Sequence, residues 1–213
     1  MSKWDSYARV HLSVLTSAQL EVYREVDAHA SGHVVDVGCG GGRMGAMLSN
    51  NSRIQSYVGV DASPEMIRVA RRLLDEIHID TFSVVETPIE VFTSDNFDFG
   101  FSINSYYAWS NPVSVLAHIR SLLKPAAPFL LATPNPRLDM PLLLAQADRE
   151  LLGHPDYRTF RNLNLELAST YPGNFVEMHE LVHQTQEAGF LLESCHTAFF
   201  LGGLNFVYLR NPG

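Results

Sequence analysis

The chain of 213 residues is poor in cysteine, in basic residues and in long apolar runs. Its two cysteines are too few for a disulfide framework. Lys and Arg number 15 against 23 Asp and Glu, which argues against a nucleic-acid partner, because phosphate contacts need clustered basic side chains. No apolar run approaches the roughly 20 residues of a membrane span. The N-terminus lacks the apolar core of a signal peptide, so we expect a cytoplasmic protein with no membrane partner.

Internal repeats and low-complexity tracts are also absent, which excludes repeat architectures. Hydrophobic residues make up 46% of the chain and are spread along it, so wholesale disorder is excluded as well. This length and distribution predict one well-buried domain over residues 1–213.

A glycine-rich turn follows the first apolar run. The run Val34–Val37 contains one acid, Asp36, and glycines then occupy positions 38, 40, 41 and 42. Apolar residues at helical spacing come next, so the stretch predicts a strand, a tight turn and a helix. Glycines let a ligand approach the backbone, and the acid favours a cationic or hydroxyl-bearing ligand over a phosphate.

A second strand, Tyr57–Val60, ends in another acid, Asp61. Ser63 is a natural helix N-cap, and Pro64 suits the first position of the helix that follows. An acid at the end of this strand is typical of a group that accepts hydrogen bonds from two ribose hydroxyls. The alternative interpretation of Asp61 is a helix-capping acid.

Further strands are expected at Phe82–Val85, Phe97–Ile103 and Phe129–Ala132, and a hairpin is expected from Leu191 to Leu209. In this order, the motifs resemble the class I, Rossmann-like family of S-adenosylmethionine (SAM)-dependent methyltransferases. The resemblance covers residues 32–135 closely and 176–210 more loosely. It implies an α/β fold with a doubly wound, seven-stranded, mostly parallel sheet and an antiparallel C-terminal hairpin.

The resemblance also implies that SAM is the cofactor and that the ends of the first four strands bind it. The implied cofactor-binding residues are Asp36, Gly38, Cys39, Gly40, Gly42, Asp61, Ala62, Met66, Glu86, Thr87 and Asn104. Glu86 stands at the adenine contact, where the family more often has Asp. Cys39 is interpreted as a small packing residue rather than a nucleophile.

Two segments outside the sheet are expected to cover the pocket. Residues 1–30 predict a helical cap, on which Trp4, Tyr7 and His11 either point inward or serve ordinary packing. Residues 136–176 form an insertion after the fifth strand, above the edge of the sheet where ligands bind in this class of fold. We interpret the insertion as a lid that sets substrate choice and excludes water. The alternative is an oligomer-forming insertion, and a homo-oligomer stays open.

The segment His179–His183 matches H-E-x-x-H, in which two histidines on one helix face bind zinc. However, Gln186 replaces the glycine of the longer zinc-protease pattern. The stretch that ends at Gly189 is typical of an amphipathic helix with a glycine cap before a strand. We therefore expect the last helix of the methyltransferase fold here and no metal.

Three functions compete. The first is methyl transfer from SAM to a small-molecule acceptor, with Tyr106, Tyr107 or Trp109 supporting the sulfonium by a cation–π contact. The second is cyclisation of SAM to azetidine-2-carboxylate with release of methylthioadenosine, for which Asn104, Asn135 and Tyr171 would hold a folded SAM. The third is a non-catalytic SAM-binding subunit, against which the intact glycines and both acids argue. His11 and His154 are the candidate general bases.

Overall fold

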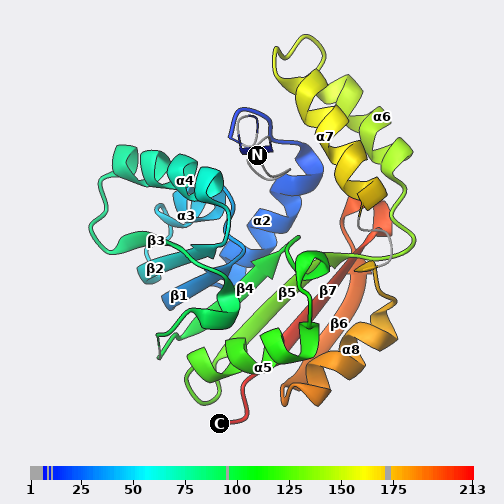
Figure 1. Ribbon diagram of the computed structural model, residues 1–213. Coiled ribbons are helices and arrows are strands. Elements are labelled where there is room, and N and C mark those ends of the chain that lie inside the picture. Colours follow the sequence, from blue (N-terminus) through cyan, green and yellow to red (C-terminus); the bar gives the residue numbers. More distant parts are fainter. Residues whose placement is uncertain (1–6, 9, 11, 95, 171–173) are drawn as a thin grey trace.

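A computed structural model describes residues 7, 8, 10, 12–94, 96–170 and 174–213 (Figure 1). Within these residues, seven strands form one sheet with the order β3-β2-β1-β4-β5-β7-β6. The strands are β1 Gly32–Val37, β2 Ile54–Asp61, β3 Phe82–Glu86, β4 Phe99–Ile103, β5 Pro128–Pro134, β6 Leu191–Ala198 and β7 Leu204–Arg210. The first five pair in parallel, and β7 pairs antiparallel with both β5 and β6. The predicted fold class is confirmed.

Helices cover both faces of the sheet (Figure 1). They are α2 Ser17–His29, α3 Arg43–Leu48, α4 Pro64–Ile77, α5 Pro112–Leu122, α6 Met140–Glu150, α7 Tyr157–Thr170 and α8 Met178–Glu187, with short 3-10 turns η1 Ile89–Val91, η2 Tyr106–Ala108 and η4 Phe200–Gly202. Because successive strand residues point to opposite faces, Val34 packs with α2 and α3 whereas Val35 packs with α5 and α8. Two apolar layers therefore hold the sheet between them.

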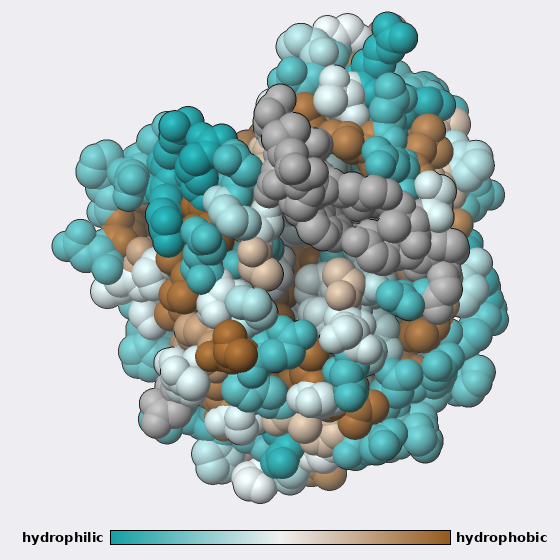
Figure 2. All heavy atoms as spheres, in the orientation of Figure 1, coloured by the Kyte–Doolittle hydropathy of each residue, from teal (hydrophilic) through white to brown (hydrophobic). Residues whose placement is uncertain are grey.

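Helix α4 begins as its sequence predicts. The Ser63 hydroxyl accepts a hydrogen bond from the backbone N–H of Met66 at 3.3 Å, and Pro64 takes the first helical position. The outer face of α4 carries Arg68, Arg71 and Arg72, all exposed, and forms the hydrophilic surface at the upper left of Figure 2. These arginines belong to a solvated helix face, as expected for the side of the helix away from the sheet.

The N-terminal segment and the insertion pack together beyond the carboxyl ends of the parallel strands. One apolar cluster joins Tyr7 and Val14 to Ala147 of α6 and Phe160 of α7. The insertion is more helical than expected, because α7 begins at Tyr157 rather than near residue 162. Figure 1 shows α6 and α7 rising above the strand ends beside α2.

A polar contact ties α6 to the start of α2. Glu150 accepts hydrogen bonds from the backbone N–H of Ser17 at 3.0 Å and from its hydroxyl at 2.5 Å. Gln146 donates to the same hydroxyl at 3.0 Å. Cap and insertion are therefore joined at one corner.

In the described part of the chain, no helix has both the length and the apolar character needed to cross a membrane.

Candidate functional site

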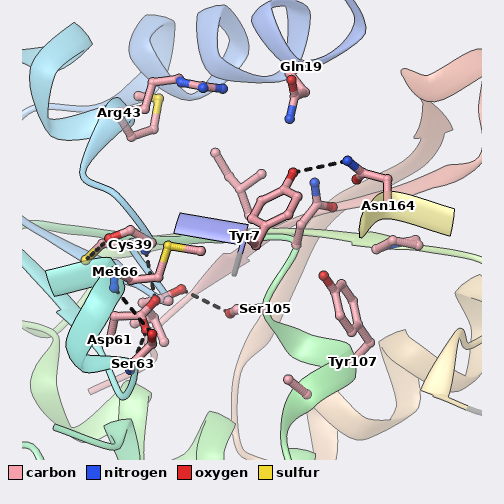
Figure 3. Close-up of a pocket in the computed structure, with 18 of the residues that line it drawn as sticks. Tyr7, Gln19, Cys39, Arg43, Asp61, Ser63, Met66, Ser105, Tyr107 and Asn164 are labelled. Carbon is pink, nitrogen blue, oxygen red and sulfur yellow. Dashed lines mark hydrogen bonds between the residues drawn. The ribbon is translucent and has the colours of Figure 1, made fainter. Parts of the chain in front are cut away.

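A cavity of about 640 Å³ lies at the carboxyl ends of β1, β2 and β4, enclosed by the cap and the insertion (Figure 3). Its size is within the range of roughly 300–1,000 Å³ that is typical of small-molecule sites. The strands supply one wall, whereas α2, α3, α6 and α7 supply the others. The parallel strands thus deliver three loop segments to one place, as expected at the switch point of an open α/β sheet.

The glycine turn packs directly against the loop after β4. Gly38 has a φ of +77°, and a Cβ atom there would lie 2.3 Å from Cβ of Ser105. The Ser105 hydroxyl donates to the carbonyl oxygen of Val37 at 3.1 Å, and it also bonds the Ser102 hydroxyl at 2.6 Å. Only glycine fits this position, and its backbone consequently faces the cavity.

Asp36, 3% exposed, lies beneath this turn near the end of β1 and lines the cavity. The hydroxyl of Tyr57 donates to its Oδ2 at 2.7 Å. Burial raises the pKa of Asp36 to about 7, against the lowering effect of the Tyr57 hydrogen bond; nearby Asp61 adds to the rise. Asp36 is therefore a buried acid without a cationic partner among the described residues, and a cationic ligand would stabilise its charged form.

Asp61 joins the first two motifs. Its Oδ2 accepts from the backbone N–H of Gly40 at 2.9 Å, and its Oδ1 accepts from that of Ser63 at 2.9 Å. Burial raises the pKa of Asp61, and the two backbone hydrogen bonds oppose that rise. Ser63, not Asp61, caps α4, so the simple capping interpretation does not account for the position of Asp61.

Asn104 closes β4 in a left-handed conformation, with a φ of +56°. Its backbone N–H donates to the carbonyl oxygen of Ala132 at 2.9 Å, which continues the strand pairing. Its side-chain Oδ1 is buried and has no hydrogen-bond partner in the part of the chain that the structure describes. A buried acceptor without a donor is costly, so this oxygen is ready to accept from a ligand in the cavity.

Most of the residues predicted to bind the cofactor do line the cavity. They are Asp36, Gly38, Cys39, Gly40, Asp61, Ala62, Met66, Thr87 and Asn104. Burial raises the pKa of the Cys39 thiol, which agrees with a packing role rather than a nucleophilic one.

Gly42 and Glu86 do not line it. Gly42 caps α3 with a φ of +76°, and a Cβ there would lie 3.0 Å from that of Ala70, so this glycine serves helix packing. Glu86 is exposed at the end of the edge strand β3. The residues that follow it, from Thr87 to Glu90, reach the cavity instead.

The proposed reacting centre is not assembled as predicted. Tyr106 is 1% exposed and points into the core, where its hydroxyl donates to Oε1 of Gln184 on α8. Asn135 is equally buried, and its amide donates to the carbonyl oxygen of Gly202 at 3.1 Å. Neither lines the cavity, whereas Asn104 does, as do Tyr107 and Trp109, the other two candidates for the sulfonium contact. Tyr171 lies outside the described residues.

Of the two candidate general bases, the structure describes only His154. His154 is not among the lining residues, and its Nδ1 accepts from the backbone N–H of Asp156 at 3.2 Å. His11 and Trp4 lie outside the described residues, whereas Tyr7 does line the cavity.

Several lining residues had no clear signal in the sequence. The cap and α3 contribute Thr16, Ala18, Gln19, Tyr23 and Arg43, and the insertion contributes Leu138, Met140, Leu143, Leu144, Gln146, Ala147, Glu150, Phe160, Asn164 and Phe175. The insertion residues are mainly apolar, so this side of the cavity suits an apolar body.

The two histidines of H-E-x-x-H are exposed on α8, which packs on the sheet through Leu181 and Thr185. His183 lies 4.0 Å from the carboxylate of Glu187. Among the described residues, no group of three or more His, Cys, Asp or Glu is placed to hold a metal ion. The expected absence of a metal stays a prediction.

A family model for a methyltransferase domain matches residues 28–191. A SAM-dependent methyltransferase from Aquifex aeolicus has a similar structure, with a TM-score of 0.67 at 16% identity over 94% of this chain and 92% of its own. The N-methyltransferase NodS from Bradyrhizobium japonicum, in complex with S-adenosylhomocysteine, gives 0.64 at 12% identity over 98% and 100%. A chain from the complex of the Haloferax volcanii Trm112 methyltransferase activator with a methyltransferase gives 0.71 at 16% identity over 100% and 99%. No curated protein matches the sequence.

Proposed function

Because this chain belongs to the methyltransferase-domain family and is a SAM-dependent methyltransferase, we propose that it methylates a small molecule bound under the cap and the insertion. The observation that carries the proposal is the single cavity shared by the strand ends, α2, α6 and α7. Its walls enclose the ligand on several sides, which suits a small acceptor better than a protein or nucleic-acid surface.

The residues on the strand side fit SAM, which supplies a methyl group already activated on a sulfonium. Asp61 uses each carboxylate oxygen for one backbone hydrogen bond, so each oxygen keeps a lone pair for a ribose hydroxyl. Asp36 and the unpartnered Oδ1 of Asn104 are suited to accept from the ammonium group. The segment from Thr87 to Glu90 lines the same cavity and would flank the adenine.

The insertion side would position the acceptor and exclude water. Its apolar side chains, such as Leu143, Leu144 and Phe160, leave few groups that could hold water against the reacting atoms. Proximity and orientation of this kind can supply roughly 7–11 kcal/mol. No histidine is among the described residues lining the cavity, and His11 lies outside those residues. Alignment of the acceptor with the methyl group is the contribution on which the proposed mechanism depends most.

Incubation with methyl-labelled SAM and separate pools of small metabolites, proteins and RNA would test this proposal. We expect label in the small-metabolite pool, and less transfer by an Asp61→Asn variant when SAM is limiting. Label only in protein or RNA would contradict the small-molecule assignment. Methylthioadenosine formed from SAM alone would instead indicate cyclisation, a reaction for which the structure does not place Asn135 in the cavity. A cytoplasmic location and a homo-oligomer stay predictions.

A further inference from the structure

One cation faces the cavity among its described lining residues, and it is Arg43. Its Nη2 donates to the carbonyl oxygen of Val14 at 2.8 Å, which fixes the guanidinium against the N-terminal segment. Its Nη1 is buried and has no hydrogen-bond partner in the described part of the chain. A buried charged donor without an acceptor costs free energy that an anionic ligand would recover.

Polar side chains from α2 line the same side of the cavity, and Tyr23 among them interacts with the Arg43 guanidinium. Figure 3 shows Arg43 and Gln19 on the helical side of the cavity, across from Asp61 and Ser63 on the strand side. Gln19 accepts from the backbone N–H of Thr16 through its Oε1, which turns its amide nitrogen toward the cavity (Figure 3). Tyr23 of the same helix lines the wall beside them.

Tyr23 is coupled to the guanidinium of Arg43. Burial raises the pKa of Tyr23, the charge of Arg43 and its hydrogen bond oppose that rise, and Asp36 adds to it. The pKa of Asp36, in contrast, responds to burial, Tyr57 and Asp61. Tyr23 therefore lies between the two charges, with Arg43 on the cap side of the cavity and Asp36 on the strand side.

We propose that Arg43, with Tyr23 and Gln19, forms a carboxylate-binding subsite on the cap side, and that the acceptor is an apolar molecule bearing a carboxylate. This inference rests on the proposed function. The planar guanidinium matches a carboxylate, and the apolar wall of α6 lies in the same cavity to receive the rest of the molecule. With its carboxylate bound to Arg43, the acceptor would extend its apolar body toward Asn104 and the reacting methyl group.

Two molecules could bring the carboxylate: the acceptor, or SAM through its own amino-acid group. Apolar side chains of α6 line the same cavity, which favours an acceptor that has an apolar body and a carboxylate.

Calorimetry with defined probes distinguishes these sources. S-adenosylhomocysteine and methylthioadenosine, which lacks the amino-acid carboxylate, are titrated into wild type, Arg43→Gln, Arg43→Lys and Tyr23→Phe. Phenylacetate and phenylacetamide are then titrated into each protein saturated with S-adenosylhomocysteine. Arg71→Gln is the matched control, because it removes one positive charge from an exposed position outside the cavity. Thermal unfolding of each variant shows whether loss of the Val14 contact disturbs the fold.

We expect phenylacetate to bind the wild-type complex more tightly than phenylacetamide. Arg43→Gln should weaken phenylacetate roughly 10- to 150-fold, as for lost hydrogen bonds to a charged group, while both nucleosides bind as before. Arg43→Lys should retain part of the affinity, and Arg71→Gln all of it. A loss confined to S-adenosylhomocysteine would keep the subsite but overturn the carboxylate-bearing acceptor.

Unchanged affinities for every probe in Arg43→Gln would overturn the subsite and leave the proposed function intact. Failure of the wild type to bind S-adenosylhomocysteine would contradict the proposed function itself. The two failures are therefore distinguishable.

Discussion

The buried acid at the end of β1 predicts that cofactor binding depends on pH near neutrality. Asp36 has a pKa of about 7 because burial disfavours its charged form. The ammonium group of S-adenosylhomocysteine needs the ionised carboxylate. Affinity should therefore rise with pH, as the fraction of ionised Asp36 increases.

The size of the effect follows from that pKa. The ionised fraction is about one tenth at pH 6 and about three quarters at pH 7.5. Affinity should rise roughly eightfold between these values, which is about 1.2 kcal/mol. Because the bound cation lowers the pKa of Asp36, binding near pH 7 should release about half a proton.

Calorimetry in buffers of different ionisation enthalpy measures both the affinity and the protons released. Asp36→Asn should remove the pH dependence, since the amide does not titrate in this range. Tyr57→Phe should move the midpoint to higher pH, because the Tyr57 hydroxyl now lowers the pKa of Asp36. The same eightfold rise in Asp36→Asn would refute this account, as would proton uptake on binding.

The raised pKa of Asp36 also affects the stability of the ligand-free protein, which should fall with pH whereas cofactor affinity rises. Asp36 holds its proton up to about pH 7 when folded, whereas the unfolded chain loses it near 3.8. The folded state thus binds more protons between these values, and the free energy of unfolding should fall as pH rises from about 4 to about 7. Asp36→Asn should flatten that part of the stability profile in urea unfolding experiments.

Three further changes test the geometry of the cavity. Gly38→Ala should lower the free energy of unfolding by more than about 1 kcal/mol and abolish measurable S-adenosylhomocysteine binding. Its control in thermal unfolding is Gly153→Ala, because Gly153 has a similar φ of +83° but lies in open space. Asp61→Asn should weaken S-adenosylhomocysteine roughly 5- to 150-fold in calorimetry, and equal affinity would contradict the ribose assignment. Glu150→Gln should speed hydrogen exchange at the start of α2 and in α6 without changing cofactor affinity, because it weakens the contact with Ser17; unchanged exchange would show that this contact does not hold the insertion.

The strand side of the cavity was predictable because its signals are local. The glycines and Asp36 lie within a few residues of one another, and Ser63 caps the helix that Asp61 precedes. Such patterns specify their own turn and helix start, whatever packs against them. Asn104 was predictable for the same reason, because it directly follows an apolar run that the sequence identifies as a strand.

The directions of neighbouring side chains could not be predicted in the same way. Tyr106 and Tyr107 are adjacent in η2, yet Tyr107 lines the cavity and Tyr106 packs under α8. The left-handed conformation of Asn104 sets the direction in which the chain enters η2, and the two tyrosines alone do not indicate that direction. The direction of the Asn135 side chain depends on a contact between distant parts of the chain, since its amide donates to the carbonyl oxygen of Gly202, 67 residues later.

The acceptor side depends on contacts between distant parts of the chain, so no local pattern in the sequence indicates its polar residues. Arg43 follows the glycine turn directly. Its guanidinium is held by the carbonyl oxygen of Val14, which lies 29 residues earlier and just before α2. The cap and the insertion are joined by a hydrogen bond between Ser17 and Glu150, which are 133 residues apart in the chain. A family that keeps its local cofactor motifs can thus vary its acceptor through such long-range contacts, because they lie on segments that the sheet does not require. The specificity of this enzyme should accordingly respond to changes in α2 and α6 that leave S-adenosylhomocysteine affinity unaltered.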